Sequence, residues 1–145
     1  MIVTFCGHSE IDNEREVENW LNQVIAQLRQ NEKVTFYLGG YGAFDRMAAR
    51  TVHEHKQYAA GFESVYVLPY LNRKVDLSLY DSTVFPPLEN TPPRFAILKR
   101  NQWMVDESEL VVAYVRHSWG GAANLLEYAK KRDKKTVAYP NLLQL

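Results

Sequence analysis

The sequence lacks the features that would place it in an oxidising compartment or a membrane. Its 145 residues include one cysteine, Cys6, so no disulfide can form within the chain, which fits a reducing cytosol. No apolar run approaches the length of a membrane-spanning helix, and Met1 leads directly into a strand-like segment rather than a signal peptide. We therefore expect a cytoplasmic protein without a membrane partner.

A surplus of charge of either sign is also absent. Lysine plus arginine and aspartate plus glutamate number 17 each, whereas duplex-DNA binders usually carry a basic excess. We therefore do not expect a nucleic acid as partner. Internal repeats and low-complexity tails are missing too, and 46% of the residues are apolar, so the sequence predicts one globular domain over residues 1–145.

Two common phosphate-binding motifs and a metal-ligand spacing are missing as well. The glycine turn at Gly39 contains neither the G-x-G-x-x-G fingerprint of dinucleotide sites nor the Gly-Lys-Ser/Thr of a P-loop. Cys6, His8 and His117 do not form a recognised zinc spacing. We therefore expect no metal site and no bound cofactor.

What the sequence does contain is a regular alternation of short apolar runs with amphipathic segments of helical spacing. The runs predict strands at residues 2–6, 34–38, 65–68, 110–114 and 135–139. Helices are predicted to begin after Asp12 or Asn13, and to run from Ala43 to Gly61, from Thr91 to about Asp106, and from near Gly121 to Arg132. This order predicts an α/β fold: a doubly wound, Rossmann-like domain with a mainly parallel five-stranded sheet and helices on both faces.

The segment 70–91 breaks this alternation. It has little periodicity, and a loop of this length in a globular domain is often functional. The alternative is a surface excursion that contains a short helix at about Val75–Leu79. Beyond it, Thr91 is predicted to cap the third helix, with Pro92 in the first turn.

Three glycine-bearing turns each follow an apolar run. Because the carboxyl ends of parallel strands meet at one edge of a sheet, we expect these turns to line one crevice. The second and third turns also open helices, whose first amides attract anions. The predicted ligand-binding residues in these turns are Gly7, His8, Gly39, Gly40, Gly42, Gly120 and Gly121. The alternative is that the glycines only shape tight turns.

Polar side chains near these turns add to the predicted site. Asp45 could accept a ribose hydroxyl or a base N–H, or only serve its helix dipole. Arg100 and Asn101 interrupt the apolar stripe of the third helix, where Arg100 meets an anion, pairs with Glu127 or forms a structural ion pair. Asn124 and Glu127 lie in the fourth helix. Glu127 could hold sugar hydroxyls or stabilise positive charge at an anomeric carbon, or simply be solvated.

Four segments, in this order along the chain, resemble the SLOG superfamily. They are Val3–His8, Tyr41–Ala48, Arg100–Asp106 and Gly120–Glu127. The Arg-Asn-x-x-Met-Val-Asp run at Arg100–Asp106 looks most like the YpsA-like branch. The resemblance covers almost the whole chain, and it implies a Rossmann-like fold that binds nucleotides or nucleotide-derived ligands.

The branches of this superfamily differ in function. The resemblance implies cleavage of nucleoside monophosphates for LOG-type enzymes, single-stranded DNA binding for relatives of DNA-processing protein A, and sensing of NAD-derived signals for others. Arg100 and Glu127 match the catalytic pair of the LOG-type enzymes. However, Asn101 stands where these enzymes usually have lysine, Ala123 where they have glycine and Asn124 where they have threonine. These departures weaken the expectation of hydrolysis more than that of binding.

We therefore expect a sensor or binding module for an NAD- or ADP-ribose-like ligand or a nucleoside monophosphate. The first alternative is an N-glycoside hydrolase, in which Glu127 stabilises the transition state and Arg100 orients the phosphate. The second is single-stranded nucleic-acid binding, with aromatic residues as stacking platforms. A homo-oligomer with Trp20 or Trp103 as an anchor stays open, since both residues could equally belong to the core.

Overall fold

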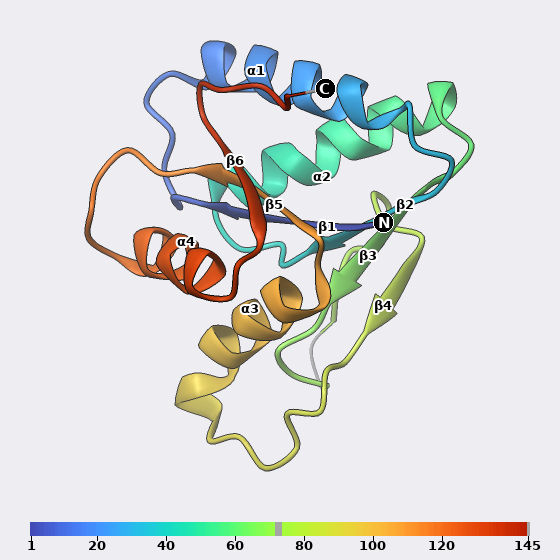
Figure 1. Ribbon diagram of the computed structural model, residues 1–145. Coiled ribbons are helices and arrows are strands. Elements are labelled where there is room, and N and C mark those ends of the chain that lie inside the picture. The colour runs from blue at the N-terminus through green and yellow to red at the C-terminus, as the bar shows by residue number, and fades with distance from the viewer. Residues whose placement is uncertain (72–73, 145) are drawn as a thin grey trace.

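The computed structural model describes residues 1–71 and 74–144. At its centre is one parallel sheet of six strands in the order β4-β3-β2-β1-β5-β6 (Figure 1). The strands are β1 (Ile2–Gly7), β2 (Val34–Leu38), β3 (Phe62–Val67), β4 (Ser82–Val84), β5 (Leu110–Tyr114) and β6 (Lys135–Ala138). The predicted α/β class with a parallel, Rossmann-like sheet is confirmed.

Helices cover both faces of this sheet in pairs (Figure 1). α1 packs beside α2 on one face, and α3 packs beside α4 on the other. Their bounds are α1 (Glu14–Leu28), α2 (Ala43–His55), α3 (Ala96–Glu107) and α4 (Gly121–Lys131), with short 3-10 turns η1 (Lys56–Tyr58) and η2 (Pro93–Phe95). α2 thus ends before the predicted Gly61. No helix among the described residues is long and apolar enough to cross a membrane.

The sheet has six strands where the sequence predicts five. The additional strand, β4, lies within segment 70–91 and pairs with β3, with Ser82 opposite Val65. Two of its three residues are exposed, so it has no apolar period by which a sequence reading could find it. Residues 75–79 form an irregular turn rather than the alternative helix, and residues 72–73 of this segment lie outside the described residues.

The start of α3 also differs from the prediction. Thr91 does not cap this helix, whose N-terminal flanking residue is Phe95, without a side-chain cap hydrogen bond. The cause is the pair Pro92-Pro93. A residue that precedes proline is disfavoured in the helical region, and Pro92 is accordingly extended, with ψ 137°. The helix therefore begins only beyond this pair, at Ala96.

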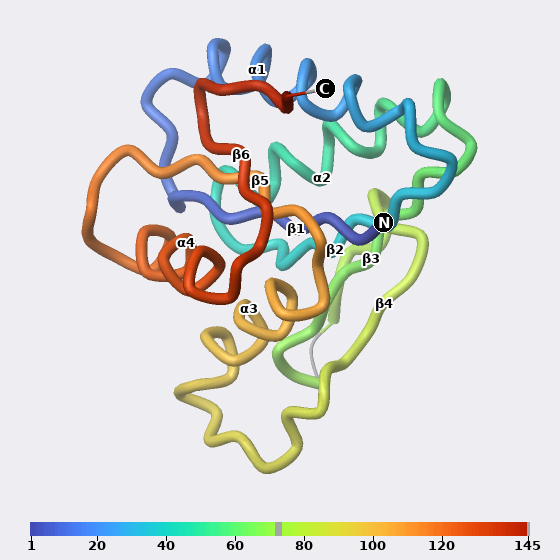
Figure 2. The backbone as a smooth tube through the Cα atoms, viewed as in Figure 1, coloured from blue at the N-terminus to red at the C-terminus, as the bar shows by residue number. Residues whose placement is uncertain are grey.

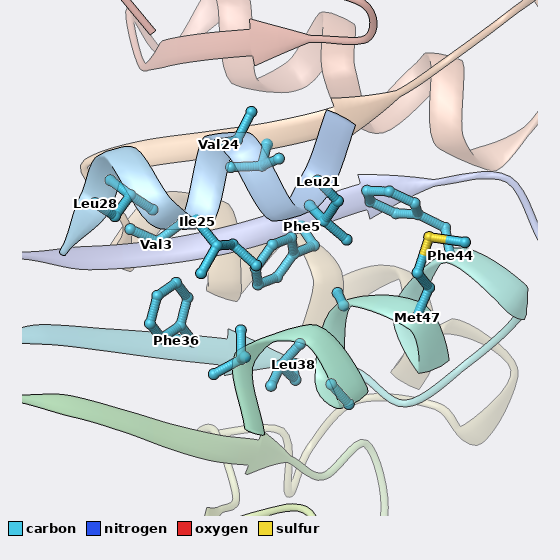
Figure 3. Close-up of a cluster of buried hydrophobic side chains, with 14 of the residues drawn as sticks. Val3, Phe5, Leu21, Val24, Ile25, Leu28, Phe36, Leu38, Phe44 and Met47 are labelled. Atoms are coloured by element: carbon cyan, nitrogen blue, oxygen red, sulfur yellow. The ribbon is translucent and has the colours of Figure 1, made fainter. Parts of the chain in front are cut away.

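The larger hydrophobic core lies between the sheet and the α1–α2 layer (Figure 3). Successive side chains of a strand point to opposite faces, so Val3 and Phe5 of β1 face these helices together with Phe36 and Leu38 of β2. A smaller cluster lies under α4 on the other face, where Cys6 of β1 packs with β5. β1 is therefore buried on both sides and provides a rigid base for whatever its carboxyl end carries.

The C-terminal segment ties β6 back to the first helix. After β6 the chain runs alongside α1 (Figure 2). There the Trp20 indole donates a hydrogen bond to the Asn141 carbonyl at 2.6 Å, and the Leu143 amide donates to the side chain of Gln27 at 2.9 Å. Trp20 is thus a core residue, 4% exposed, rather than an exposed anchor for a second copy.

The strand order reverses between β1 and β5. From β1 the chain moves outward through β2 and β3 to β4, and then returns along α3 to β5 on the other side of β1. The two loops that follow β1 and β5 therefore diverge and leave a crevice between them. In open parallel sheets this switch point, at the carboxyl ends of the strands, is where ligands bind.

Candidate functional site

A cavity of about 550 Å³ opens beyond the carboxyl ends of β1 and β5. Its walls come from the β1–α1 loop, the β2–α2 turn, one face of α3, and the β5–α4 loop with the first turn of α4. The residues predicted for the site that line it are Gly7, His8, Asp45, Arg100, Asn101, Gly120 and Gly121. The switch point therefore brings together residues from four separate parts of the chain.

The start of α2 is closed to a ligand by the protein itself. The Ala43 amide donates to the Ser9 carbonyl at 2.9 Å, and the Phe44 amide to the His8 carbonyl at 3.4 Å. Gly7 makes this contact possible, because a Cβ atom there would overlap the Phe44 ring. The β1–α1 loop thus occupies the position that an anion was expected to take.

Gly39, Gly40 and Gly42 shape this turn and do not line the cavity. Gly40 and Gly42 have φ angles of 65° and 91°, which only glycine adopts without strain. A Cβ on Gly39 would lie 3.1 Å from the Arg100 guanidinium carbon and 3.3 Å from a carboxylate oxygen of Asp45. The turn therefore lets two charged side chains approach its backbone closely.

The start of α4, in contrast, is open to the cavity. Gly120 has φ 94°, and its carbonyl accepts the first helical hydrogen bond, from the Asn124 amide at 3.0 Å. The amides of the first turn have no acceptor within the helix. Gly121 lines the cavity, and a Cβ placed on it would meet no atom within 4 Å. This helix start is therefore the one that a ligand can reach.

Arg100 is one of the largest fully buried side chains, only 1% exposed. Its Nη1 donates to the carbonyls of Gly39 at 3.0 Å and Val67 at 2.8 Å, just past β2 and at the last residue of β3. Its Nε donates to the Asn101 side-chain oxygen at 2.8 Å. Arg100 thus joins α3 to the ends of two strands and places its positive charge at the floor of the cavity.

Asp45 faces this guanidinium from the first turn of α2. One of its carboxylate oxygens accepts a hydrogen bond from the Tyr41 amide at 3.2 Å. Burial raises the pKa of Asp45 to about 6, although the Tyr41 amide and the charge of Arg100 act in the opposite direction. Neutral pH lies above this pKa, so the carboxylate is mostly ionised there and can accept hydrogen bonds in the cavity.

Cys6 lines the cavity but is not a nucleophile. Its thiol donates to the Ala122 carbonyl at 3.0 Å. Burial, together with the charge of Asp45, raises the pKa of Cys6 to about 12, so the thiol stays protonated at neutral pH. Within the described residues there is no cluster of three or more histidine, cysteine and carboxylate side chains that could hold a metal ion.

Three stacked rings form one wall of the cavity. His8 stacks on His117 at a centroid distance of 4.1 Å, and His117 stacks on Trp119 at 3.9 Å. Burial lowers the pKa of His8, and the neighbouring His117 and Arg116 add to this effect. A neutral His8 fits its contact, since its Nε2 accepts the Arg116 amide at 2.8 Å. We call His8, His117 and Trp119 the ring ladder.

Asn124 and Glu127 lie apart from this cavity. Both are exposed and line a separate groove between α3 and α4, together with Leu98 and Tyr128. The structure therefore does not bring Glu127 to Arg100, which faces the cavity at the switch point. The part of α4 that lines the cavity consists of Gly121, Ala122 and Leu125, whereas Asn124 and Glu127 lie on the side of the helix that faces the groove.

Sequence reasoning missed several residues of the cavity wall. Tyr41, Arg116 and Trp119 line the cavity, and so does His117, whose spacing from Cys6 and His8 matches no zinc site. Their position was the available signal: Arg116, His117 and Trp119 directly follow a strand that ends at the predicted crevice. An arginine and two ring side chains between a buried strand and a glycine turn favour a binding loop.

No protein-family model and no curated protein matches the sequence. Solved structures do match. The molybdenum cofactor carrier protein of Chlamydomonas reinhardtii is 19% identical, with a TM-score of 0.57 over 94% of this chain and 74% of that one. DNA processing protein A of Streptococcus pneumoniae is 16% identical, with a TM-score of 0.66 over 97% of this chain and 50% of that one.

A second DNA processing protein A, from Helicobacter pylori and described with a single-stranded DNA binding mode, has a TM-score of 0.62 at 14% identity, over 99% of this chain and 67% of that one. The chain spans only half the length of the streptococcal protein. At these identities the likeness shows a common fold. It also leaves the expectation that nucleic acid is no partner without support, because two of these neighbours process or bind DNA.

Proposed function

We propose that this chain is a nucleotide-binding domain of the SLOG superfamily and that its cavity holds a nucleotide or a nucleotide-derived ligand. One observation carries the proposal: a cavity of about 550 Å³ lies where the strand order reverses, with an open helix start in its wall. Cavities of 300–1,000 Å³ are typical of small-molecule sites. The volume suits a mononucleotide.

The anionic end of the ligand binds between α4 and Arg116. The amides at Gly121 and Ala122 begin α4, and a helix start with free amides binds phosphate. Arg116 also lines the cavity. Its side chain is exposed, with the guanidinium carbon 5.7 Å from the centre of the Tyr139 ring, and a guanidinium can contact two phosphate oxygens at once. In this arrangement Arg100 supports the floor rather than binding the phosphate.

The remaining polar wall accepts hydrogen bonds. Glu10 and Asp12 of the β1–α1 loop line the cavity together with Asp45. Ionised carboxylates are acceptors only, so they suit the hydroxyls of a ribose or the N–H groups of a base. A ligand with a phosphate at one end and several donors at the other satisfies both kinds of wall, and nucleotides have this character.

Single-stranded nucleic-acid binding is the second candidate, and a specific observation favours it. Trp119 and Tyr41 line the mouth of the cavity and are 68% and 63% exposed, which is unusual for such large aromatic side chains. Exposed rings are the platforms on which successive bases stack. Hydrolysis through Glu127 has no such support, because this residue lies outside the cavity.

Binding of AMP, ADP-ribose and NAD, measured by calorimetry, tests the proposal with matched variants. Arg116→Ala removes a cation from the cavity, and Lys131→Ala removes one from the exposed end of α4. We expect saturable binding of at least one of these ligands. Arg116→Ala should weaken it by about 1.5–3 kcal/mol, the range for hydrogen bonds to charged groups. Lys131→Ala should leave it unchanged.

Two outcomes overturn the proposal. One is the absence of saturable binding of all three ligands, and the other is equal weakening in both variants. Tight, salt-sensitive binding of a short oligo(dT) without binding of the mononucleotide decides for the second candidate. Chromatography of the incubated ligands for free base shows whether any bound nucleotide is also cleaved.

A further inference from the structure

The ring ladder connects the interior of the protein to the mouth of the cavity. Its inner member, His8, packs edge-on against Tyr114 at 5.6 Å, and Tyr114 in turn stacks on Phe44 of the core at 5.8 Å. The two rings behind His8, those of Tyr114 and Phe44, are almost fully buried. The outer member, Trp119, is 68% exposed. A continuous series of aromatic contacts therefore ends on an indole in solvent.

Backbone hydrogen bonds hold the two histidines of the ladder in place. His8 accepts the Arg116 amide at Nε2, and His117 donates from Nδ1 to the Trp119 carbonyl at 2.9 Å. The second bond folds the β5–α4 loop so that the indole lies on the imidazole of His117, with only 16° between the two planes. The orientation of Trp119 is thus set by the protein before any ligand arrives.

An indole held in this way has one face on His117 and most of its remaining surface in water. Aromatic pairs are stabilised beyond the burial of their area, so the outer face is a favourable place for another ring. Trp119 lines the cavity together with Gly120 and Gly121. A ring stacked on Trp119 and a phosphate bound at the start of α4 can therefore belong to one small molecule.

We propose that the ligand of this cavity carries a planar heteroaromatic ring and that this ring stacks on Trp119 as the next member of the ring ladder. The inference rests on the proposed function and deepens it, because it assigns the ring of the ligand to a residue that no motif singles out. The class of ligand is a phosphorylated heterocycle, such as a nucleotide, rather than a sugar phosphate or an inorganic anion.

A pair of ligands that differ only in the ring tests this inference. AMP carries adenine, whereas ribose 5-phosphate has the same sugar and phosphate without it. Titrations of the full chain with both ligands are compared for the wild type, Trp119→Tyr and Trp119→Leu. The tyrosine keeps an aromatic face, and the leucine keeps apolar volume without one. Tyr58→Leu is the matched control, because Tyr58 is 67% exposed and lies in a groove between α1 and α2, away from the cavity.

We expect the wild type to bind AMP more tightly than ribose 5-phosphate. Trp119→Leu should weaken AMP binding by about five- to 150-fold, the range for removing one base–aromatic stack, and should leave ribose 5-phosphate unaffected. Trp119→Tyr should keep most of the preference for AMP, and Tyr58→Leu should keep all of it. Quenching of the Trp119 fluorescence by AMP is expected in parallel, because the ring lies on the indole.

The outcomes separate the two proposals. Equal binding of AMP and ribose 5-phosphate in the wild type, or an equal loss of both in Trp119→Leu, overturns the stacking inference and leaves the anion site intact. Absence of saturable binding of either ligand at millimolar concentration overturns both proposals. Binding of oligo(dT) that depends on Trp119, without AMP binding, shows that the indole receives a base of a polymer instead and also overturns the inference.

Discussion

Asp45 is ionised at neutral pH, although its buried position favours the protonated form. Its pKa of about 6 lies above the ordinary value of 3.8, because burial outweighs the Tyr41 amide and Arg100. A group whose pKa is raised on folding contributes stability at low pH and loses that contribution as pH rises from 3.8 through 6. At neutral pH the ionised side chain therefore weakens the folded state. Strained or destabilised groups of this kind concentrate at functional sites.

The substitution Asp45→Asn tests this description. Asparagine keeps an oxygen for the Tyr41 amide and carries no charge. We expect the free energy of unfolding to rise by about 1–3 kcal/mol at pH 7.5, and the gain to vanish near pH 4, where the wild-type carboxyl is itself neutral. Urea denaturation at the two pH values measures the difference. A gain of the same size at both, or a loss at pH 7.5, contradicts the raised pKa.

His55 is a second titratable residue with a defined role, far from the cavity. It is 6% exposed; its Nδ1 accepts hydrogen bonds from Arg29 at 2.6 and 3.0 Å, and its Nε2 donates to Asn22 at 2.8 Å. Burial, followed by the charge of Arg29, lowers the pKa of His55 below its ordinary 6.5. Protonation would place a hydrogen on the nitrogen that accepts from Arg29, so the neutral form joins α1 to α2.

Acid should therefore loosen this contact. A histidine whose pKa is lowered on folding contributes stability above pH 6.5, and this stability is lost as pH falls below that value. We expect His55→Gln to be less stable than the wild type at pH 8, with a smaller difference at pH 5. The control is His53→Gln, two residues away on the exposed side of the same helix. Thermal melts at both pH values give the comparison, and a constant difference between them argues against the assignment.

The two helices that begin after a glycine differ in whether their first turn is open to a ligand. α2 and α4 each begin after a glycine with φ near 90°, Gly42 and Gly120, so their sequences predict the same anion site. The structure fills the first with the carbonyls of Ser9 and His8 and leaves the second open. Sequence could not separate them, because the difference depends on the path of the β1–α1 loop and not on either turn.

Substitution of one glycine at each helix start makes this difference measurable. In Gly42→Ala, the new Cβ would lie 2.8 Å from the Ser9 Cα at φ 91°, so we expect a loss of about 1–3 kcal/mol in the free energy of unfolding. In Gly121→Ala, the Cβ meets nothing within 4 Å, so stability should stay the same or rise slightly while AMP binding weakens. Chemical denaturation gives the first pair of values and calorimetry the second. Equal destabilisation by both substitutions would show that the α4 start is as closed as that of α2.

At the scale of the whole molecule, periodicity predicts the fold better than it predicts the site. The strands over 34–38 and 110–114 have the predicted bounds, because apolar runs between turns define buried strands well. β4 escapes prediction because its pairing with β3 is non-local and two of its three residues, Ser82 and Thr83, are polar and exposed. The surroundings of Glu127 depend on non-local packing in the same way: helical spacing gives its face on α4, whereas the packing of α4 against α3 decides what that face meets.

A nucleotide site between β1 and β5 is tested by backbone amide mapping with heteronuclear NMR during a titration with AMP. We expect the largest shifts on both sides of the switch point, at Gly7 and His8 after β1 and at Arg116 through Ala122 after β5, with only small shifts at Asn124 and Glu127. Shifts centred on the groove between α3 and α4, or a spectrum that AMP leaves unchanged, would contradict a nucleotide site between β1 and β5.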